Sequence, residues 1–284
     1  MNENVLNKLK ILAESAKYDV SCSSSGTVRS NKPGMLGNTV GGWGICHSFA
    51  EDGRCISLLK VMLTNYCIYD CAYCINRRSN DLPRATLSVS ELVDLTMEFY
   101  RRNYIEGLFL SSAVEVSPDH TAERILESLR LLRYKYGFSG YIHAKIIPGV
   151  SQELLHEIGL VADRLSVNIE MPTARSLQAF APQKKPKEIF APMRQITNSL
   201  IERNSLKGPG NMFRGIAVNA PEHYLKGFSQ GIEEKDKAGS SRADRDTQDS
   251  VTAVSSAQSL SRNRRRQGED FAPAGQTTQM IIGA

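Results

Sequence analysis

Three cysteines in a short run are the residues of this sequence best suited to chemistry. Cys67, Cys71 and Cys74 form a CxxxCxxC pattern, and thiolates this close together can converge on one soft metal centre. A closed structural zinc site needs four ligands, usually as two separated pairs, and no second pair lies nearby. The pattern therefore favours an iron cluster in which one iron lacks a protein ligand and stays open for chemistry. A zinc site or chemically inert thiols are the alternatives.

Three further cysteines lie upstream of this run. Cys22, Cys46 and Cys55 are spaced by 24 and 9 positions, which matches no short metal motif. Together with His47 they could meet in space as an auxiliary iron–sulfur or zinc site. They could equally be buried cysteines that pack as small apolar side chains.

The cysteine run follows the first of a series of alternating strand-like and helix-like segments. A capping box, Ser88 and Glu91, opens the first helix of this series. Units of strand and helix of this length imply parallel strands joined by right-handed crossovers. Strands are predicted at 56–65, 106–114, 141–147, 164–170 and 271–284, and helices at 88–103, 119–136, 151–162 and through most of 173–204.

The polarity of two strands helps to choose between an open doubly wound sheet and a barrel. Apolar and polar residues alternate along 141–147 and along 164–170. A parallel strand covered by helices on both faces should be apolar on both, so one polar face favours a (β/α) barrel with a ligand inside. An edge strand with a wet face is the alternative. In the barrel, His143 and Lys145 would point inward as candidates for substrate or cofactor contact.

Composition excludes several other classes of protein. The chain has 284 residues, of which 41% are hydrophobic and 23% charged, so it is neither wholly disordered nor collagen-like nor disulfide-dense. No apolar run reaches the roughly 18 residues of a transmembrane helix. Residues 1–17 form an amphipathic helical pattern without the continuous apolar centre of a signal peptide, so we expect a cytoplasmic protein. The net charge of +5 permits a nucleic-acid partner without arguing for one.

The CxxxCxxC pattern, with Tyr73 before its last cysteine and a strand before the whole run, resembles the radical S-adenosylmethionine (radical SAM) superfamily. The resemblance implies a [4Fe–4S] cluster on Cys67, Cys71 and Cys74, whose open iron chelates S-adenosylmethionine. It also implies a partial (β/α) barrel, of which five of six strands are present here. The further contacts to S-adenosylmethionine implied by the resemblance fall on Tyr73, Ser111, Ser112, Ser166, Asn168 and Glu170.

A narrower resemblance is to a radical SAM group assigned to DNA modification or repair. It implies a nucleic-acid substrate, a uracil-DNA-glycosylase-like partner and an electron donor such as flavodoxin or ferredoxin. A protein or small-metabolite substrate, and a non-catalytic, metal-stabilised adaptor, are the alternatives. The matching segments are 16–26, 44–60, 74–81, 99–113, 140–149, 162–172 and 271–284.

These features divide the chain into four parts. A cysteine-containing extension, 1–55, precedes the barrel core at 56–228. The segment 229–270 is rich in Ser, Gln, Arg and Asp and lacks aromatic residues, so it cannot bury enough apolar area to order itself and is predicted to be a disordered insertion. The fifth strand, 271–284, returns to apolar character at the point where the chain stops. We therefore expect a C-terminally truncated, and in that case inactive, form of a longer enzyme.

Overall fold

The computed structural model describes residues 3–17, 44–49, 55–206 and 271–280, all within one compact unit. A second unit, 217–267, lies outside the described residues. The predicted disordered insertion at 229–270 and Cys22 therefore fall outside the described part of the chain.

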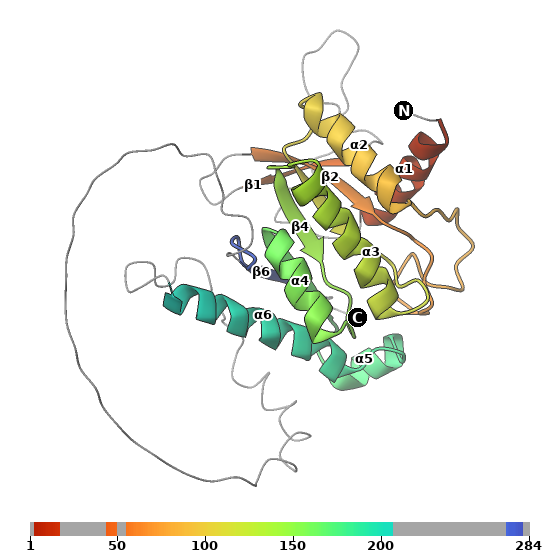
Figure 1. The fold of residues 1–284 in the computed structure, drawn as a ribbon. Coiled ribbons are helices and arrows are strands. Elements are labelled where there is room, and N and C mark those ends of the chain that lie inside the picture. Colours follow the sequence, from red (N-terminus) through yellow and green to blue (C-terminus); the bar gives the residue numbers. More distant parts are fainter. Residues whose placement is uncertain (1–2, 18–43, 50–54, 207–270, 281–284) are drawn as a thin grey trace, which may run out of the picture. The chain divides into compact units, whose positions relative to one another are not determined.

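A six-stranded sheet with strand order β1-β2-β3-β4-β5-β6 is the centre of this unit (Figure 1). The five predicted strands are present, and each pairs in parallel with the next. The sheet gains an antiparallel strand that the sequence did not indicate, β1, which pairs with β2 inside the predicted extension. The strands are β1 (Ile45–Phe49), β2 (Cys55–Met62), β3 (Gly107–Ser111), β4 (Tyr141–Lys145), β5 (Arg164–Glu170) and β6 (Gln276–Met280).

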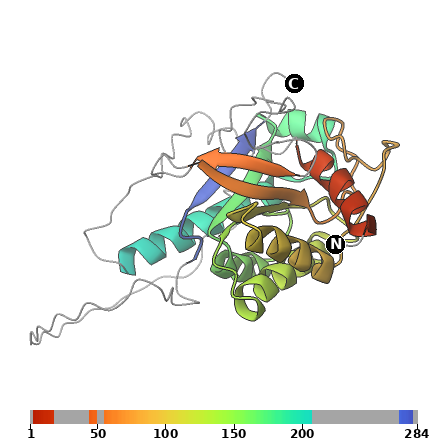
Figure 2. The same cartoon turned by 90° about the horizontal axis from the view of Figure 1, so that it is seen from above.

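Helices follow the strands in the alternation that the sequence predicted. The capping box of Ser88 and Glu91 is present, with the Glu91 N–H donating to Ser88 Oγ at 3.1 Å and the Ser88 N–H donating to Glu91 Oε2 at 2.8 Å. Three of the helices, α2, α3 and α4, lie side by side over one face of the sheet (Figures 1 and 2). The helices are α1 (Glu3–Ala16), α2 (Val89–Arg101), α3 (Pro118–Arg130) with its π-helical continuation η1 (Leu131–Lys135), α4 (Gln152–Val161), α5 (Ala174–Phe180) and α6 (Pro186–Leu206).

On β4 and β5, the two faces differ in polarity, as the alternating pattern of these two strands predicted. On the inner face, the register neighbours Lys60, Phe109 and His143 also contact one another. The Lys60 ammonium lies 5.8 Å from the Phe109 ring, and the His143 ring packs edge-on against that ring at 4.7 Å. The alternate residues face the helices and belong to the main hydrophobic core: Leu59, Val61, Leu108, Leu110, Ile142, Ala144, Leu165 and Val167.

The fold is thus α/β, with a parallel sheet that is not closed into a full barrel. Within the described residues β1 and β6 are its two edges. The carboxyl ends of the five parallel strands meet along one rim of such a sheet, and ligand sites of α/β proteins lie at that rim.

Candidate metal and cofactor site

A cavity of about 500 Å³ lies at the carboxyl ends of the parallel strands. The connection between β2 and α2, residues 63–88, forms one wall with all three cysteines of the CxxxCxxC run. The ends of β4, β5 and β6 contribute Lys145, Asn168 and Gln279, respectively. The site therefore combines one loop with the ends of several strands.

Cys67, Cys71 and Cys74 all line this cavity. Cys71 is buried, at 4% exposure, while the other two are half-buried. Burial raises the pKa of the Cys74 thiol, and neighbouring Cys67 and Cys71 raise it further. Burial also raises the pKa of Cys71, with a smaller contribution of the same sign from Cys67. The three thiols thus line the same cavity, and two of them are shifted toward the protonated form.

Main-chain hydrogen bonds fix the cysteine loop to its surroundings. The Ile68 N–H donates to the Val114 carbonyl beyond β3 at 2.8 Å, and the Ala72 N–H donates to the Phe180 carbonyl at the end of α5 at 2.7 Å. Within the loop, the Cys74 N–H donates to the Cys71 carbonyl at 3.0 Å. The loop has no regular secondary structure between residues 65 and 85, yet its shape is determined by these bonds.

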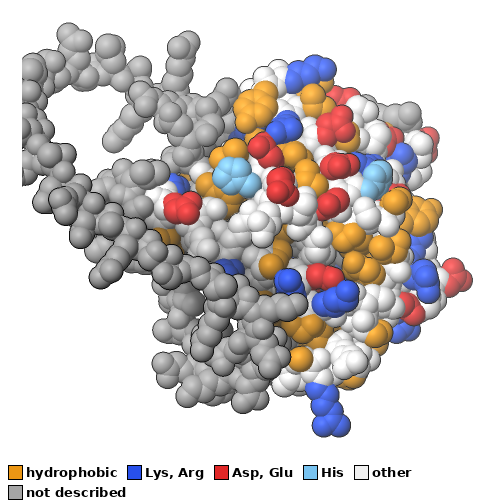
Figure 3. All heavy atoms as spheres, turned by 60° about the horizontal axis from the view of Figure 1, so that its bottom comes forward, with side chains coloured by type: hydrophobic (Ala, Val, Ile, Leu, Met, Phe, Trp, Pro, Cys, Tyr) orange, Lys and Arg blue, Asp and Glu red, His pale blue; other side chains and the backbone are white. Residues whose placement is uncertain are grey.

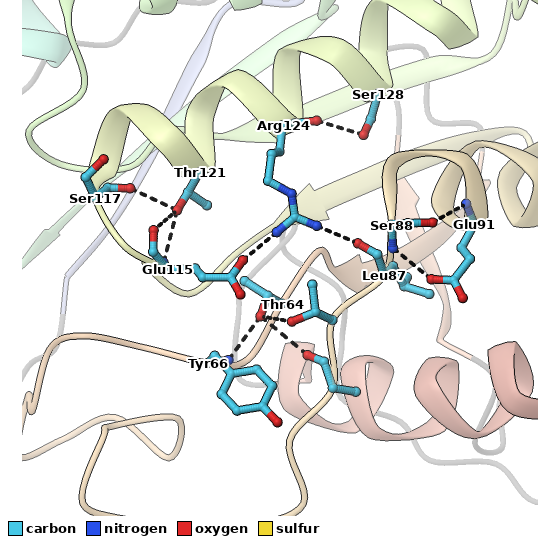
Figure 4. A network of polar contacts seen from close by, with 12 residues as sticks. Thr64, Tyr66, Leu87, Ser88, Glu91, Glu115, Ser117, Thr121, Arg124 and Ser128 are labelled. Carbon is cyan, nitrogen blue, oxygen red and sulfur yellow. Dashed lines mark hydrogen bonds and ion pairs between the residues drawn. The ribbon is translucent and has the colours of Figure 1, made fainter.

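A polar network fixes the start of the loop and the exit of β3 (Figure 4). Thr64 Oγ1 lies 2.6 Å from Thr86 Oγ1 and accepts the Tyr66 N–H at 3.2 Å, so the two ends of the loop are joined at their base. Arg124 of α3 donates to the Leu87 carbonyl at 2.9 Å and pairs with Glu115 beyond β3. The loop after β2 and the loop after β3 thus share one anchor on α3.

A buried ion pair forms another part of the cavity wall. Lys184 Nζ donates to Glu170 Oε1 at 2.7 Å and to the Tyr73 hydroxyl at 3.3 Å, and it lies 5.7 Å from the Tyr73 ring centroid. The side chains of Lys184 and Glu170 are only 12% and 9% exposed. Burial alone would lower the pKa of Lys184, but the Glu170 carboxylate, followed by Tyr73 and Cys71, raises it above its usual value. Burial raises the pKa of the Tyr73 hydroxyl.

The backbone at Glu170 explains how this carboxylate reaches the cavity. The pairing of β5 with β6 shifts register between Asn168 and Glu170, and Glu170 has a φ of 68°. A bulge of this kind re-aims a side chain, and a positive φ is strained for a residue with a Cβ. The strained turn at the end of β5 therefore presents Glu170 to Lys184.

Two polar atoms on the cavity wall have no hydrogen-bond partner among the described residues: Asn76 Oδ1 and Ser112 Oγ. The Asn76 side chain is 5% exposed, and its amide nitrogen reaches only the Met62 sulfur at 3.4 Å. Buried polar atoms in this state cost free energy unless a ligand or water satisfies them. The wall is therefore suited to a ligand that offers hydrogen-bond donors.

The predicted site residues fall into two groups. Tyr73, Ser112, Asn168 and Glu170 line the cavity with the three cysteines. Ser111 and Ser166 do not line it, and both are buried, at 1% and 5% exposure. Of the two inward-facing candidates, Lys145 lines the cavity, while His143 is fully buried below it against Phe109.

The upstream cysteines are placed only in part. Cys46 and His47 lie on β1, and Cys55 is the first residue of β2. Cys46 is opposite Leu58 in the register, whereas Cys55 is opposite Phe49. Among residues 3–17, 44–49, 55–206 and 271–280, no group of three or more His, Cys, Asp or Glu residues is arranged to hold a metal ion. The auxiliary site stays a prediction.

Sequence reasoning missed Lys184 and Asn76. Lys184 lies in the connection between α5 and α6, where no motif marks it and one lysine among several carries no signal. Asn76 follows Cys74 by two residues, so its closeness to the motif was the available signal.

Comparisons with solved structures give partial matches of low identity. The FeFe-hydrogenase maturase HydG from Carboxydothermus hydrogenoformans is 20% identical, covering 48% of this chain and 32% of its own, with a TM-score of 0.42. Methylornithine synthase (PylB) is 13% identical, covering 48% and 40%, with a TM-score of 0.42. The cobalamin-dependent S-adenosylmethionine radical enzyme OxsB is 13% identical, covering 52% and 27%, with a TM-score of 0.37.

The matched parts span 27–40% of the length of these three proteins and about half of this chain. No protein-family model and no curated protein sequence matches the chain.

Proposed function

We propose that this chain belongs to a radical S-adenosylmethionine enzyme. The observation that carries the proposal is the convergence of Cys67, Cys71 and Cys74 on a 500 Å³ cavity at the carboxyl rim of a parallel sheet. Three cysteines that line one cavity fit an iron cluster with one open iron better than a closed structural zinc site, which needs four protein ligands. When bound, the cluster and S-adenosylmethionine supply a 5′-deoxyadenosyl radical that abstracts hydrogen from a substrate.

The residues of the chain bind and orient in this proposal. The three cysteines hold the cluster and leave one iron open. The unpartnered Asn76 Oδ1 and Ser112 Oγ accept hydrogen bonds from S-adenosylmethionine on the same wall.

Three residues predicted as cofactor contacts complete the binding wall. Tyr73 and Asn168 bind the nucleoside part of S-adenosylmethionine, a role that rests on the family resemblance and on their place at the cavity. The Glu170 carboxylate neutralises the buried ammonium of Lys184 in the wall of the same cavity.

Reductive cleavage of S-adenosylmethionine tests the enzyme class. The protein is reconstituted anaerobically with iron and sulfide, reduced with dithionite and supplied with S-adenosylmethionine, and 5′-deoxyadenosine is quantified. We expect product from the native sequence and none from Cys71→Ala, since the variant removes a cluster ligand. An intact [4Fe–4S] cluster that yields no 5′-deoxyadenosine would defeat the assignment.

For the substrate we propose nucleic acid, with an action in DNA modification or repair. The support is the resemblance of segments across the chain to a group with that assignment; the net charge of +5 permits such a substrate but does not argue for it. The face drawn in Figure 3 mixes acidic, basic and apolar side chains rather than forming one basic patch. On this face, binding would therefore depend on local contacts more than on a broad basic surface.

Salt dependence of DNA binding tests this substrate class. Anisotropy of a labelled duplex is measured between 50 and 200 mM salt. Phosphate contacts release counterions from the DNA, and higher salt makes this release less favourable, so affinity falls across this range. We expect log affinity to fall linearly with log salt. No binding, or binding indifferent to salt, would favour a protein or small-metabolite substrate.

The electron donor, the protein partner and the cellular location are also proposals. A flavodoxin or ferredoxin as electron donor, a uracil-DNA-glycosylase-like partner and a cytoplasmic location follow from the resemblance and from the sequence pattern. Among the described residues, no helix is both long and apolar enough to cross a membrane.

A further inference from the structure

Arg84 is the most highly connected side chain around the cysteine loop. Its guanidinium donates to four main-chain carbonyls: those of Asn65, Asn76 (2.9 Å), Arg77 (2.7 Å) and Asn80 (3.0 Å). Arg84 touches none of the cysteines in these bonds and does not line the cavity. Its role must therefore act through the loop backbone.

The four carbonyls bracket the CxxxCxxC run. Asn65 precedes Cys67 by two residues, and Asn76 follows Cys74 by two. One rigid side chain thus joins the segment entering the run to the segment leaving it. The planar guanidinium presents five N–H donors in a fixed fork, whereas a lysine ammonium offers three donors from a single point.

Arg84 is itself held in place by its neighbours. The fully buried Asn65 side chain donates to Ser15 Oγ at 3.1 Å and to the Pro83 carbonyl at 2.9 Å, and it accepts the Ala85 N–H at 2.8 Å. The Asn65 N–H donates to the Ala85 carbonyl at 3.2 Å. The residues on both sides of Arg84 are therefore fastened to the start of the loop and, through Ser15, to α1.

We propose that Arg84 is a positioning residue that holds loop 65–80 in its ligand-binding shape before any cluster is present. The proposal rests on the proposed function only for the identity of the group that the loop binds. Without the fork, the four carbonyls lose a shared partner, and the spacing of the three thiols is no longer fixed in advance. Preorganisation of this kind lowers the cost of ordering the loop when the ligand binds.

Hydrogen–deuterium exchange of the metal-free protein tests the positioning role without any cluster. We expect Arg84→Lys and Arg84→Met to speed exchange in peptides covering 65–80 by about tenfold or more, because local opening loses its main restraint. Exchange in α4, residues 152–161, serves as the internal reference and should stay within about twofold. Unchanged exchange in 65–80, or equal acceleration in α4, would overturn a local role for Arg84.

Arg133 supplies a matched control. It donates to the carbonyls of Val161 (3.0 Å), Phe138 (2.7 Å) and Gly140 (2.7 Å) and pairs with Asp163 at 2.6 Å, at the opposite, amino-terminal rim of the sheet. Arg133→Lys removes a guanidinium that has as many hydrogen-bond partners as Arg84. It should leave the exchange rate in 65–80 within about twofold of the native rate. If exchange in 65–80 speeds up as much in Arg133→Lys as in Arg84→Lys, the effect is general destabilisation and the proposal is wrong.

Iron retention extends the test to the loaded protein. After reconstitution, we expect Arg84→Lys to release iron to a chelator about tenfold faster than the native protein, and Arg133→Lys to match the native rate. Equal release from Arg84→Lys and the native protein would overturn the proposal. A native protein that binds no iron would instead defeat the proposed function, while the exchange measurement would still decide the role of Arg84.

Discussion

At the scale of single residues, the thiols of Cys71 and Cys74 have the clearest chemical consequence. Burial raises the pKa of both above the ordinary value of 9.0, so in metal-free protein both are protonated at neutral pH. Cluster binding must therefore displace protons from these thiols. As free thiols, both are therefore weak nucleophiles at neutral pH.

Alkylation with iodoacetamide tests these pKa shifts. The thiolate is the reacting form, so Cys71 and Cys74 should label more slowly at pH 8 than a free cysteine peptide, by about tenfold or more. The rate should rise as the pH increases through and beyond 9, since only then does the thiolate form. Labelling is followed by mass spectrometry of each peptide; rates at pH 8 equal to that of the free peptide would contradict the shift.

The Lys184–Glu170 pair makes a second prediction at this scale. Replacing either partner leaves one charge buried, so Glu170→Gln and Lys184→Met should each lower the free energy of unfolding by about 3 kcal/mol. The double variant leaves no unpaired charge and should lose much less than the two single losses combined. Urea denaturation of the four proteins measures this coupling. Additive losses would show that the pair does not act as a unit.

Sequence reasoning could find the cysteines because all three ligands lie within one short segment. The family resemblance placed Ser112, Asn168 and Glu170 at the site, and these three do line the cavity, whereas Ser111 and Ser166, named on the same ground, do not. Sequence reasoning could not find Lys184, which reaches Tyr73 across 111 positions through the packing of the α5–α6 connection. Long-range placement of this kind depends on tertiary structure and leaves no local pattern.

At the scale of elements, the parallel strands and their helices were predictable because each has its own periodicity or cap. Ser88 and Glu91 start α2 as predicted. The strand β1 was missed because its formation depends on antiparallel pairing with β2 and no regular pattern in its own sequence marks it. Short strands are defined by their partners more than by their own sequence.

The packing of α4 against the turn before β6 gives a prediction for this scale. A Cβ on Gly159 would lie 2.0 Å from the Phe271 ring, and the Ala272 N–H donates to the Gly159 carbonyl at 2.8 Å. Gly159→Ala should therefore displace Phe271 and lower the free energy of unfolding by about 1–3 kcal/mol, despite the better helix propensity of alanine. Thermal or urea unfolding measures the loss. Glu153→Ala is the control, because Glu153 lies at an exposed position on the same helix. If the Gly159→Ala protein is as stable as this control, the close packing against Phe271 is wrong.

At the scale of the whole molecule, the described residues stop at the end of α6 and resume at Phe271 close to that helix. Arg203 of α6 donates to the carbonyls of Phe271 and Ala272 at 3.0 and 3.1 Å. The connection from 207 to 270 thus begins and ends near one place. Its predicted disorder rests on composition alone, because this segment lies outside the described residues.

Deletion of 229–270 tests whether this segment contributes to stability. Residues 207–228 would remain as the connection, and loop-closure entropy changes slowly with length, so the free energy of unfolding should change by no more than about 1 kcal/mol. A shorter connection should if anything stabilise the fold. A loss of several kcal/mol on urea denaturation would show that 229–270 packs against the sheet and is not a passive insertion.

The central claim is that the cysteine loop holds a [4Fe–4S] cluster with one open iron, and iron content combined with electron paramagnetic resonance tests it most directly. We expect at least about four iron atoms per chain after anaerobic reconstitution and a reduced-cluster signal that changes when S-adenosylmethionine is added. The Cys67→Ala/Cys71→Ala/Cys74→Ala protein should lose about four iron atoms and the response to S-adenosylmethionine. About one metal ion per chain, bound as zinc with no such signal, or an unchanged iron content and response in the triple variant, would contradict the claim.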